Sequence, residues 1–109
     1  MNVLFLCSQN RLRSPTAERI FGGREGLDVR SAGLDTDAVT TVSPELIAWA
    51  DLVFVMEKAH VNRLRRRFKS ASSGKRVVCL HIPDEFECMD PELVRILEAR
   101  VEPWLGMRR

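Results

Sequence analysis

The stretch NVLFLCSQNRLRSPTAERIF, residues 2–21, carries the most informative pattern of the chain. It opens with the apolar run Asn2–Leu6, which is typical of a strand buried on both faces of a sheet. Cys7 ends this run, and a short loop then leads to Ser14-Pro15. Serine followed by proline is typical of a helix start, because serine can cap the first turn and proline needs no N–H partner there. The stretch therefore predicts a strand that passes through a loop directly into a helix.

The rest of the chain repeats this alternation of strand and helix. Asp51–Met56 and Arg76–Leu80 are short apolar runs that predict two more strands buried on both faces, whereas Leu27–Ser31 alternates apolar and polar residues and favours a strand nearer the sheet edge. Residues with helical spacing lie between them, and Ser43-Pro44 and Asp90-Pro91 mark two further helix starts. This order predicts an α/β fold, a four-stranded parallel sheet with helices on both faces.

The composition is that of a single globular domain covering residues 1–109. A chain of this length that is 45% hydrophobic can bury one core but not two. The charged fraction is 29%, the net charge is +2, and no apolar run approaches the roughly 20 residues that cross a bilayer. The chain has three cysteines and no export signal, so we expect a cytoplasmic protein with free thiols.

The end of the first predicted strand carries the chemistry. In parallel sheets, ligands bind at the carboxyl ends of the strands, where Cys7 stands. Backbone N–H groups of a loop that enters a helix, together with the helix dipole, favour an anion such as phosphate, and they also favour a thiolate. We therefore expect Cys7 to be a nucleophile, helped by Arg13 and by the hydroxyl of Ser14. The planar fork of Arg13 can hold two phosphate oxygens.

The loop CSQNRLRSPTAE resembles the signature loop of the low-molecular-weight protein tyrosine phosphatases, in which Cys-x5-Arg-Ser opens the chain. The similarity continues through Arg30–Gly33, through Val55-Met56 with His60 following, and through Ile82-Pro83-Asp84. The resemblance implies a three-layer sandwich and a phosphatase that forms a phosphocysteine on Cys7.

The resemblance also implies a role for each residue of this loop. Cys7 would be the nucleophile and Arg13 would clamp the phosphoryl group. Asn10 would brace the loop, and Ser14 would stabilise the thiolate. Neither a metal nor another cofactor is implied. The substrate-binding residues, most of them through the backbone cradle, would be Ser8, Gln9, Asn10, Arg11, Leu12 and Ser14.

The mechanism also needs a proton donor for the leaving oxygen and a base for water, and one carboxyl group can serve as both. Asp84 and Asp90 follow the last predicted strand and so lie at the correct edge of the sheet. Asp84 has the position of the family's acid, whereas Asp90 has the following proline of its Asp-Pro motif. Because capping of the last helix already explains Asp90, we predict Asp84 as the general acid and base and keep Asp90 as the alternative.

Two departures from the family bear on the substrate. Gln9 stands where a glycine is common, and residues 34–42 contain no aromatic residue where the family carries a longer segment with an aromatic wall. Phe86 is the one ring placed to line the mouth of the site, unless it belongs to the core. The sequence therefore supports phosphatase chemistry more strongly than phosphotyrosine specificity.

The expected substrate is a phosphorylated protein or a small aryl phosphate. Arg63–Lys69 is strongly basic, but its helical spacing places Leu64 and Phe68 inward and leaves the cations on a solvated face. A net charge of +2 is also weak for a nucleic-acid-binding protein. We expect neither nucleic acid nor a membrane as a partner.

Three other functions use the same loop. An arsenate reductase would need Cys79 or Cys88 to relay a disulfide, and its turnover would depend on thiols. A phosphoryl carrier similar to the IIB components of sugar phosphotransferase systems would hold phosphate on Cys7 without releasing it to water, but such loops lack the arginine. A phosphate-binding module would keep the loop without turnover.

Overall fold

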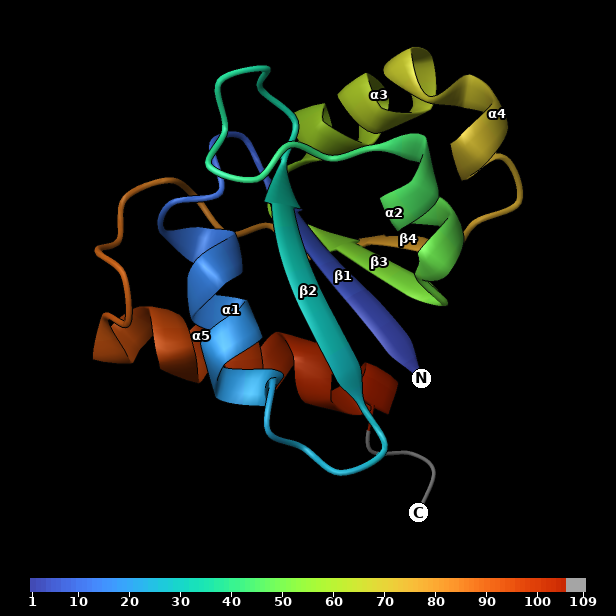
Figure 1. Cartoon of the computed structure of the whole chain (residues 1–109). Coiled ribbons are helices and arrows are strands. Elements are labelled where there is room, and N and C mark those ends of the chain that lie inside the picture. Colours follow the sequence, from blue (N-terminus) through green and yellow to red (C-terminus); the bar gives the residue numbers. More distant parts are fainter. Residues whose placement is uncertain (106–109) are drawn as a thin grey trace.

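A computed structural model describes residues 1–105 and shows strands and helices in alternation (Figure 1). All strand pairs are parallel, and the order in the sheet is β2-β1-β3-β4. The predicted α/β fold with a four-stranded parallel sheet is confirmed. The elements are β1 Asn2–Cys7, α1 Arg13–Phe21, β2 Asp28–Gly33, α2 Pro44–Trp49, β3 Leu52–Val55, α3 Lys58–Arg67, α4 Lys69–Ser72, β4 Val77–Cys79 and α5 Pro91–Leu105.

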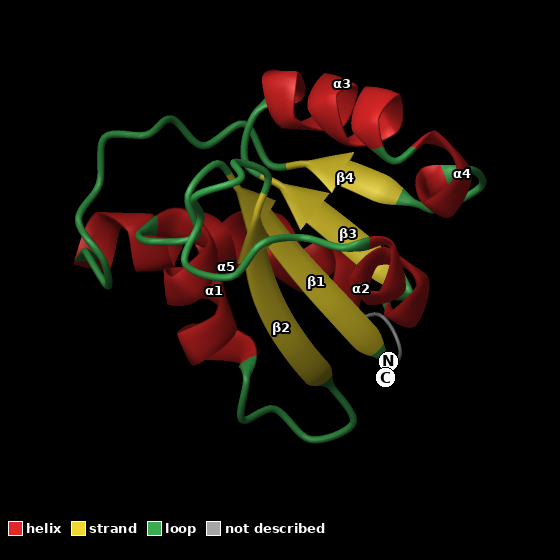
Figure 2. Ribbon diagram, turned by 45° about the horizontal axis from the view of Figure 1, so that its top comes forward, coloured by secondary structure: helices red, strands yellow, loops and turns green. Residues whose placement is uncertain are grey.

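Helices cover both faces of the sheet, as Figure 2 shows. Because side chains alternate along a strand, Val3 and Phe5 of β1 face one core while Leu4 and Leu6 face the other. The first core is completed by α1 and α5, and the second by α2 and α3. Phe5 stacks on Phe21 and on Phe54, at ring-centroid distances of 5.8 and 5.2 Å. Burial on both faces explains why β1 is a continuous apolar run.

The two edges of the sheet differ from each other in how well the sequence predicts them. Alternation in Leu27–Ser31 correctly predicts an edge strand, which the structure extends to β2 at Asp28–Gly33. The prediction that Arg76–Leu80 is buried on both faces is wrong, because β4 is the other edge strand and its three residues are half-buried.

One of the predicted helix caps is also wrong. Ser43 accepts a hydrogen bond from the N–H of Leu46, and a carboxylate oxygen of Asp90 accepts one from the N–H of Glu92, so both residues cap the helices that follow them. Ser14, however, is the second residue of α1, which begins at Arg13 without a side-chain cap. Its hydroxyl turns toward the sulfur of Cys7 instead.

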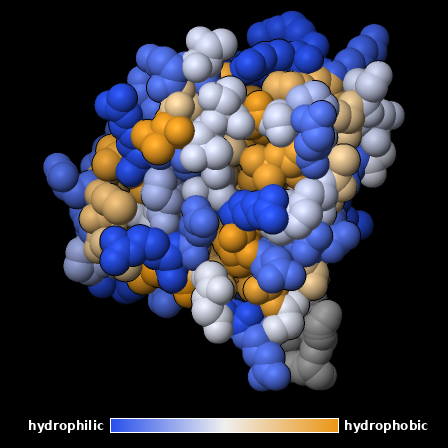
Figure 3. All heavy atoms as spheres, in the orientation of Figure 1, coloured by the Kyte–Doolittle hydropathy of each residue, from blue (hydrophilic) through white to orange (hydrophobic). Residues whose placement is uncertain are grey.

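The surface in Figure 3 shows hydrophobic residues in separate areas between hydrophilic ones. Within residues 1–105, no helix combines the length and the apolar character that a membrane crossing requires.

Candidate active site

A pocket of about 450 Å³ opens at the carboxyl ends of the parallel strands. Cys7 is the last residue of β1, and the loop 8–12 carries the chain from there into α1. The pocket therefore lies where parallel sheets bind their ligands. Its lining residues are Cys7, Ser8, Gln9, Arg11, Leu12, Arg13, Asp35 and Asp84.

Two groups that can donate a hydrogen bond lie next to the sulfur of Cys7. The backbone N–H of Asn10 donates to Sγ at 3.2 Å, and the hydroxyl of Ser14 lies 2.9 Å from Sγ. Asn10 adopts a left-handed backbone conformation with φ of 57°, which asparagine tolerates better than most residues. This turn directs the N–H of Asn10 back toward the sulfur. Both contacts are of the kind that stabilises a thiolate.

The loop also presents backbone N–H groups that have no internal partner. Those of Ser8, Gln9, Arg11 and Leu12 donate to no backbone carbonyl within residues 1–105. Such groups, next to the N-terminus of α1, form a cradle for an anion. The predicted cradle therefore has the donors that it needs.

Arg13 is held from two other strand ends. Its side chain is 4% exposed, and Nη1 donates to the carbonyl of Ile82 at 2.8 Å and to the carboxylate of Glu57. Glu57 follows β3, and Ile82 follows β4. Because these contacts occupy Nη1, the edge of the guanidinium formed by Nε and Nη2 is left for an oxyanion in the pocket.

The two candidate acids are in different places. Asp84 lines the pocket, its Oδ1 lies 3.8 Å from Nε of Arg13, and its side chain is 64% exposed. Asp90 is not among the residues that line the pocket, and its carboxylate caps α5. The structure therefore brings Asp84 together with Cys7 and Arg13, and leaves Asp90 at the helix start.

Residues 34–42, which follow β2, support the loop 8–12. Figure 1 shows these two segments side by side at the end of the sheet. The N–H groups of Leu34, Asp35 and Val39 donate to the carbonyls of Cys7, Ser8 and Gln9, at 2.9, 2.8 and 3.1 Å. These bonds continue the β1–β2 ladder beyond the strands. A Cβ on Gly33 would lie 2.6 Å from the carbonyl oxygen of Ser8, so the close approach of the two loops requires glycine.

His60 joins α3 to the loop. Its Nδ1 accepts a hydrogen bond from the N–H of Glu57 at 3.1 Å, so the ring proton of a neutral His60 lies on Nε2, 3.2 Å from the hydroxyl of Ser8. Burial, followed by the positive charge of Arg13, lowers the pKa of His60 to about 4. The ring is therefore neutral and can donate to Ser8 across the neutral pH range.

This lowered pKa predicts a pH-dependent stability. An unfolded chain binds the His60 proton with the ordinary histidine pKa of 6.5 and the folded protein only with a pKa of about 4, so acid favours unfolding between these values. We expect the free energy of unfolding to fall by roughly 2–3 kcal/mol from this group over that window. Urea titrations at several pH values measure it. The slope should disappear in His60→Gln and persist in His81→Asn, and a slope unchanged in His60→Gln would contradict the assignment.

Sequence reasoning missed Glu57, Asp35 and the contacts of His60. Glu57 and Asp35 each follow a predicted strand closely, so the rule that carboxyl ends of parallel strands meet at one edge could have identified them. Asp35 lines the pocket, and its Oδ1 lies 2.7 Å from Nη2 of Arg63 in α3.

Several predicted residues do not line the pocket. Asn10 and Ser14 are buried and contact Cys7 and each other, and neither lines the pocket. Phe86 packs against the core formed with α1 and α5, so no aromatic side chain of residues 1–105 lines the pocket. Cys88 is exposed and has its sulfur 3.6 Å from the hydroxyl of Thr16.

Comparison with known proteins gives no match among protein-family models or curated protein sequences. Solved structures, in contrast, resemble the chain over almost its whole length. The YwlE arginine phosphatase from Geobacillus stearothermophilus has a TM-score of 0.75 and 22% sequence identity, with 94% of this chain and 92% of that chain covered. The tyrosine phosphatase Wzb from Escherichia coli K30, in complex with phosphate, has a TM-score of 0.78 and 22% identity, with 96% and 98% covered.

A third solved structure, described as a protein tyrosine phosphatase, has a TM-score of 0.78 and 26% identity, with 99% of this chain and 97% of that chain covered. A variant of YwlE that carries a phosphorylated active-site serine is similar at a TM-score of 0.74 and 24% identity. The likeness in fold therefore extends over nearly the whole length of this chain and of each of these chains.

Proposed function

We propose that this chain, which has the fold of the low-molecular-weight protein tyrosine phosphatases, hydrolyses phosphomonoesters through a phosphocysteine on Cys7. The observation that carries the proposal is the pocket itself. A cysteine sulfur that faces two donors shares this pocket with unpaired backbone N–H groups, an anchored arginine and a carboxylate.

In the first step, the thiolate of Cys7 attacks the phosphorus atom, the S–P bond forms and the P–O bond to the leaving group breaks. Backbone N–H groups of the loop and the Nε–Nη2 edge of Arg13 hold the phosphoryl oxygens as their charge shifts. Asp84 gives its proton to the leaving oxygen. Its position beside Arg13, at the open side of the pocket, supports this role.

In the second step, the carboxylate of Asp84 takes a proton from water, the water oxygen attacks phosphorus and the S–P bond breaks to release phosphate. Hydrolysis rather than storage of the phosphoryl group is supported by this carboxylate and by Arg13. A phosphoryl carrier does not hydrolyse its phosphocysteine, so it needs neither a carboxylate that activates water nor this arginine. An arsenate relay is not supported, because neither Cys79 nor Cys88 is among the residues of the described chain that line the pocket.

The residues that line the pocket indicate the class of substrate. The lining includes the carboxylates of Asp35 and Asp84 and the guanidinium of Arg11. We propose a phosphorylated protein side chain or a small aryl phosphate as substrate, bound mainly through its phosphoryl group. Solved relatives include both tyrosine and arginine phosphatases.

The first experiment is hydrolysis of para-nitrophenyl phosphate by the purified protein, without added metal, between mildly acidic and neutral pH. Turnover would support the proposed phosphatase. Phosphate binding without turnover would favour the binding module, and a long-lived phosphocysteine would favour the carrier.

Asp84→Asn should lower turnover of phenyl phosphate by about 100-fold, because general acid catalysis typically contributes this much or more. The loss should be smaller with para-nitrophenyl phosphate, since nitrophenolate leaves without a proton. Initial rates across pH measure both effects, and the pH limb that reports the acid should flatten. The matched control Asp90→Asn should keep its activity and its stability, because Asp90 does not line the pocket and asparagine caps a helix about as well as aspartate. Equal activity in Asp84→Asn and wild type would remove Asp84 from the mechanism.

A further inference from the structure

We propose that Glu18 is a positioning residue for the thiolate of Cys7. Its carboxylate fixes the direction of a chain of hydrogen bonds that runs through Ser31, Asn10 and Ser14 to the sulfur. The inference rests on the proposed role of Cys7 as the nucleophile, and it extends the site to α1 and β2, on the far side of the loop from the pocket that contains the sulfur.

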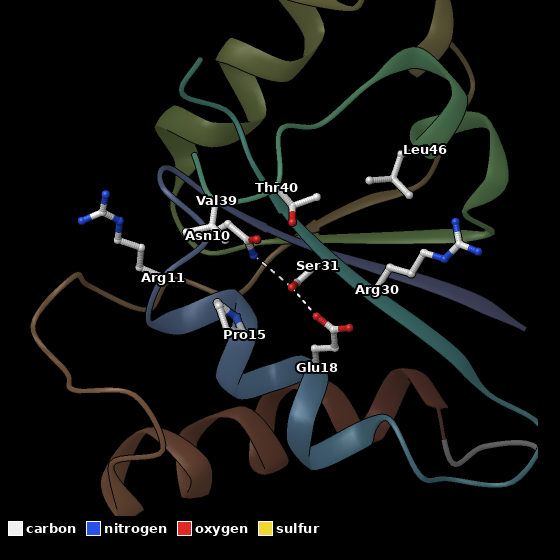
Figure 4. A pocket seen from close by; sticks show the side chains of 9 residues that line it. All are labelled: Asn10, Arg11, Pro15, Glu18, Arg30, Ser31, Val39, Thr40 and Leu46. Atoms are coloured by element: carbon white, nitrogen blue, oxygen red, sulfur yellow. Dashed lines mark hydrogen bonds between the residues drawn. The ribbon is translucent and has the colours of Figure 1, made fainter. Parts of the chain in front are cut away.

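The hydrogen bonds from Glu18 to the sulfur of Cys7 form an unbroken series in the structure. The hydroxyl of Ser31 donates to a carboxylate oxygen of Glu18 in a short hydrogen bond. Nδ2 of Asn10 lies 2.9 Å from Oγ of Ser31 and 3.0 Å from Oγ of Ser14. Figure 4 shows the part of the chain that joins Asn10, Ser31 and Glu18 across the floor of a second pocket. Ser14 then lies 2.9 Å from the sulfur of Cys7.

Counting protons shows why the carboxylate matters. An ionised carboxylate only accepts, so Ser31 must use its single hydroxyl proton on Glu18. Oγ of Ser31 can then only accept from Asn10, which must turn its NH2 group, not its carbonyl oxygen, toward both serines. Ser14 accepts one of these amide protons. Its own proton is free for the sulfur of Cys7, where it stabilises the thiolate.

Without the acceptor at Glu18, nothing fixes which group donates and which accepts in each of these hydrogen bonds. Ser31 could then donate toward Asn10, and the amide of Asn10 could rotate to present its oxygen to both serines. Ser14 would donate to that oxygen and not to Cys7. The thiolate would lose one of the two donors that face it, although no residue in contact with the sulfur had changed.

A direct charge effect of Glu18 would have the opposite sign. A nearby carboxylate opposes ionisation of a thiol, so removing it would favour the thiolate through space. Neutral His60 faces the loop through Ser8. The other charged groups at the two sites stay in place in the variants below. Those that line the thiol pocket are Arg11, Arg13, Asp35 and Asp84, and those that line the second pocket beside Glu18 are Arg11 and Arg30.

Glu18 is suited to such a test because it is not part of the core. It is half-buried and lines an open pocket of about 730 Å³ together with Asn10 and Ser31. It is not among the residues of the thiol pocket. Truncation of Glu18 should therefore leave the fold intact.

The experiment measures alkylation of Cys7 by iodoacetamide near pH 6, resolved by mass spectrometry, with exposed Cys88 as the internal reference. Glu18→Ala and Ser31→Ala should each slow alkylation of Cys7 by about tenfold, the usual effect of one hydrogen bond to a charged group. The double variant should be no slower than either single one, because both act through the same chain. The matched control Glu25→Ala, an exposed acid after α1, should leave the rate unchanged.

Faster alkylation in Glu18→Ala, an unchanged rate, or additive losses in the double variant would each overturn the proposal. If Ser31→Ala does not fold, Glu18→Gln decides instead. It should slow alkylation less than Glu18→Ala does, since its amide oxygen can still accept from Ser31. Alkylation needs no substrate, so failure of this inference is distinct from failure of the proposed function, which would show as absent turnover in the wild-type protein.

Discussion

Cys7→Ser should lower turnover of para-nitrophenyl phosphate by at least about 10⁴-fold, as expected for loss of a nucleophile. Serine can occupy the same space, but its hydroxyl stays protonated at neutral pH and needs a base. The structure offers none at this position. The groups that face the sulfur are the N–H of Asn10 and the hydroxyl of Ser14. Both stabilise an anion, and neither is a base that could take the proton from the serine hydroxyl. Initial rates of the purified variant and the wild-type protein give the ratio.

The matched control is Cys88→Ser, which changes an exposed thiol and should keep full activity. Acid quenching of the wild-type protein during turnover should leave a phosphate adduct on the peptide that contains Cys7. Substantial activity in Cys7→Ser would end the phosphocysteine mechanism.

Arg13→Lys should lower turnover by roughly 10³-fold, although the positive charge remains. The guanidinium binds the carbonyl of Ile82 and the carboxylate of Glu57 through Nη1, and it can still offer its other edge to the phosphoryl group. An ammonium group is a single point of charge and cannot do both at once. Lysine would therefore either stay with Glu57 or contact the substrate from a poorly fixed position.

The loss in Arg13→Lys should appear in kcat as well as in KM, because the arginine follows the charge of the transition state. Arg19→Lys, on the exposed side of the same helix, is the control and should match the wild-type protein. If Arg13→Lys kept activity within about threefold, the clamp would be an ordinary binding charge.

The sequence predicts most of the elements well and places the candidate residues Cys7 and Arg13 at one edge of the sheet, because both depend on local patterns. β1 shows its burial on two faces as a continuous apolar run, and the spacing from Cys7 to Arg13 places both residues at one strand end. β4 has the same apolar composition as β1, yet it lies at the edge of the sheet. Which run pairs on both sides depends on the order of the strands, and composition does not specify that order.

Side-chain contacts that form only in the folded protein account for the rest of what sequence reasoning missed. Ser14 has the sequence of a helix cap that would start the helix at Pro15, but its hydroxyl lies 2.9 Å from the sulfur of Cys7, and α1 starts two residues earlier, at Arg13. The partners of Arg13 come from the ends of β3 and β4, 44 and 69 residues along the chain. Such pairs form only once the sheet has brought the strand ends together.

The hydrogen bonds from residues 34–42 to the loop have a consequence for how the protein opens. Because the three bonds continue the pairing of β1 with β2, the loop cannot become disordered unless these bonds to residues 34–42 break. The N–H groups of Leu34, Asp35 and Val39 should therefore exchange their hydrogens slowly, whereas those of Ser8, Gln9, Arg11 and Leu12, which donate to no backbone carbonyl within residues 1–105, should exchange fast until an anion binds. Phosphate then meets a cradle that is already ordered, and its binding costs little conformational entropy.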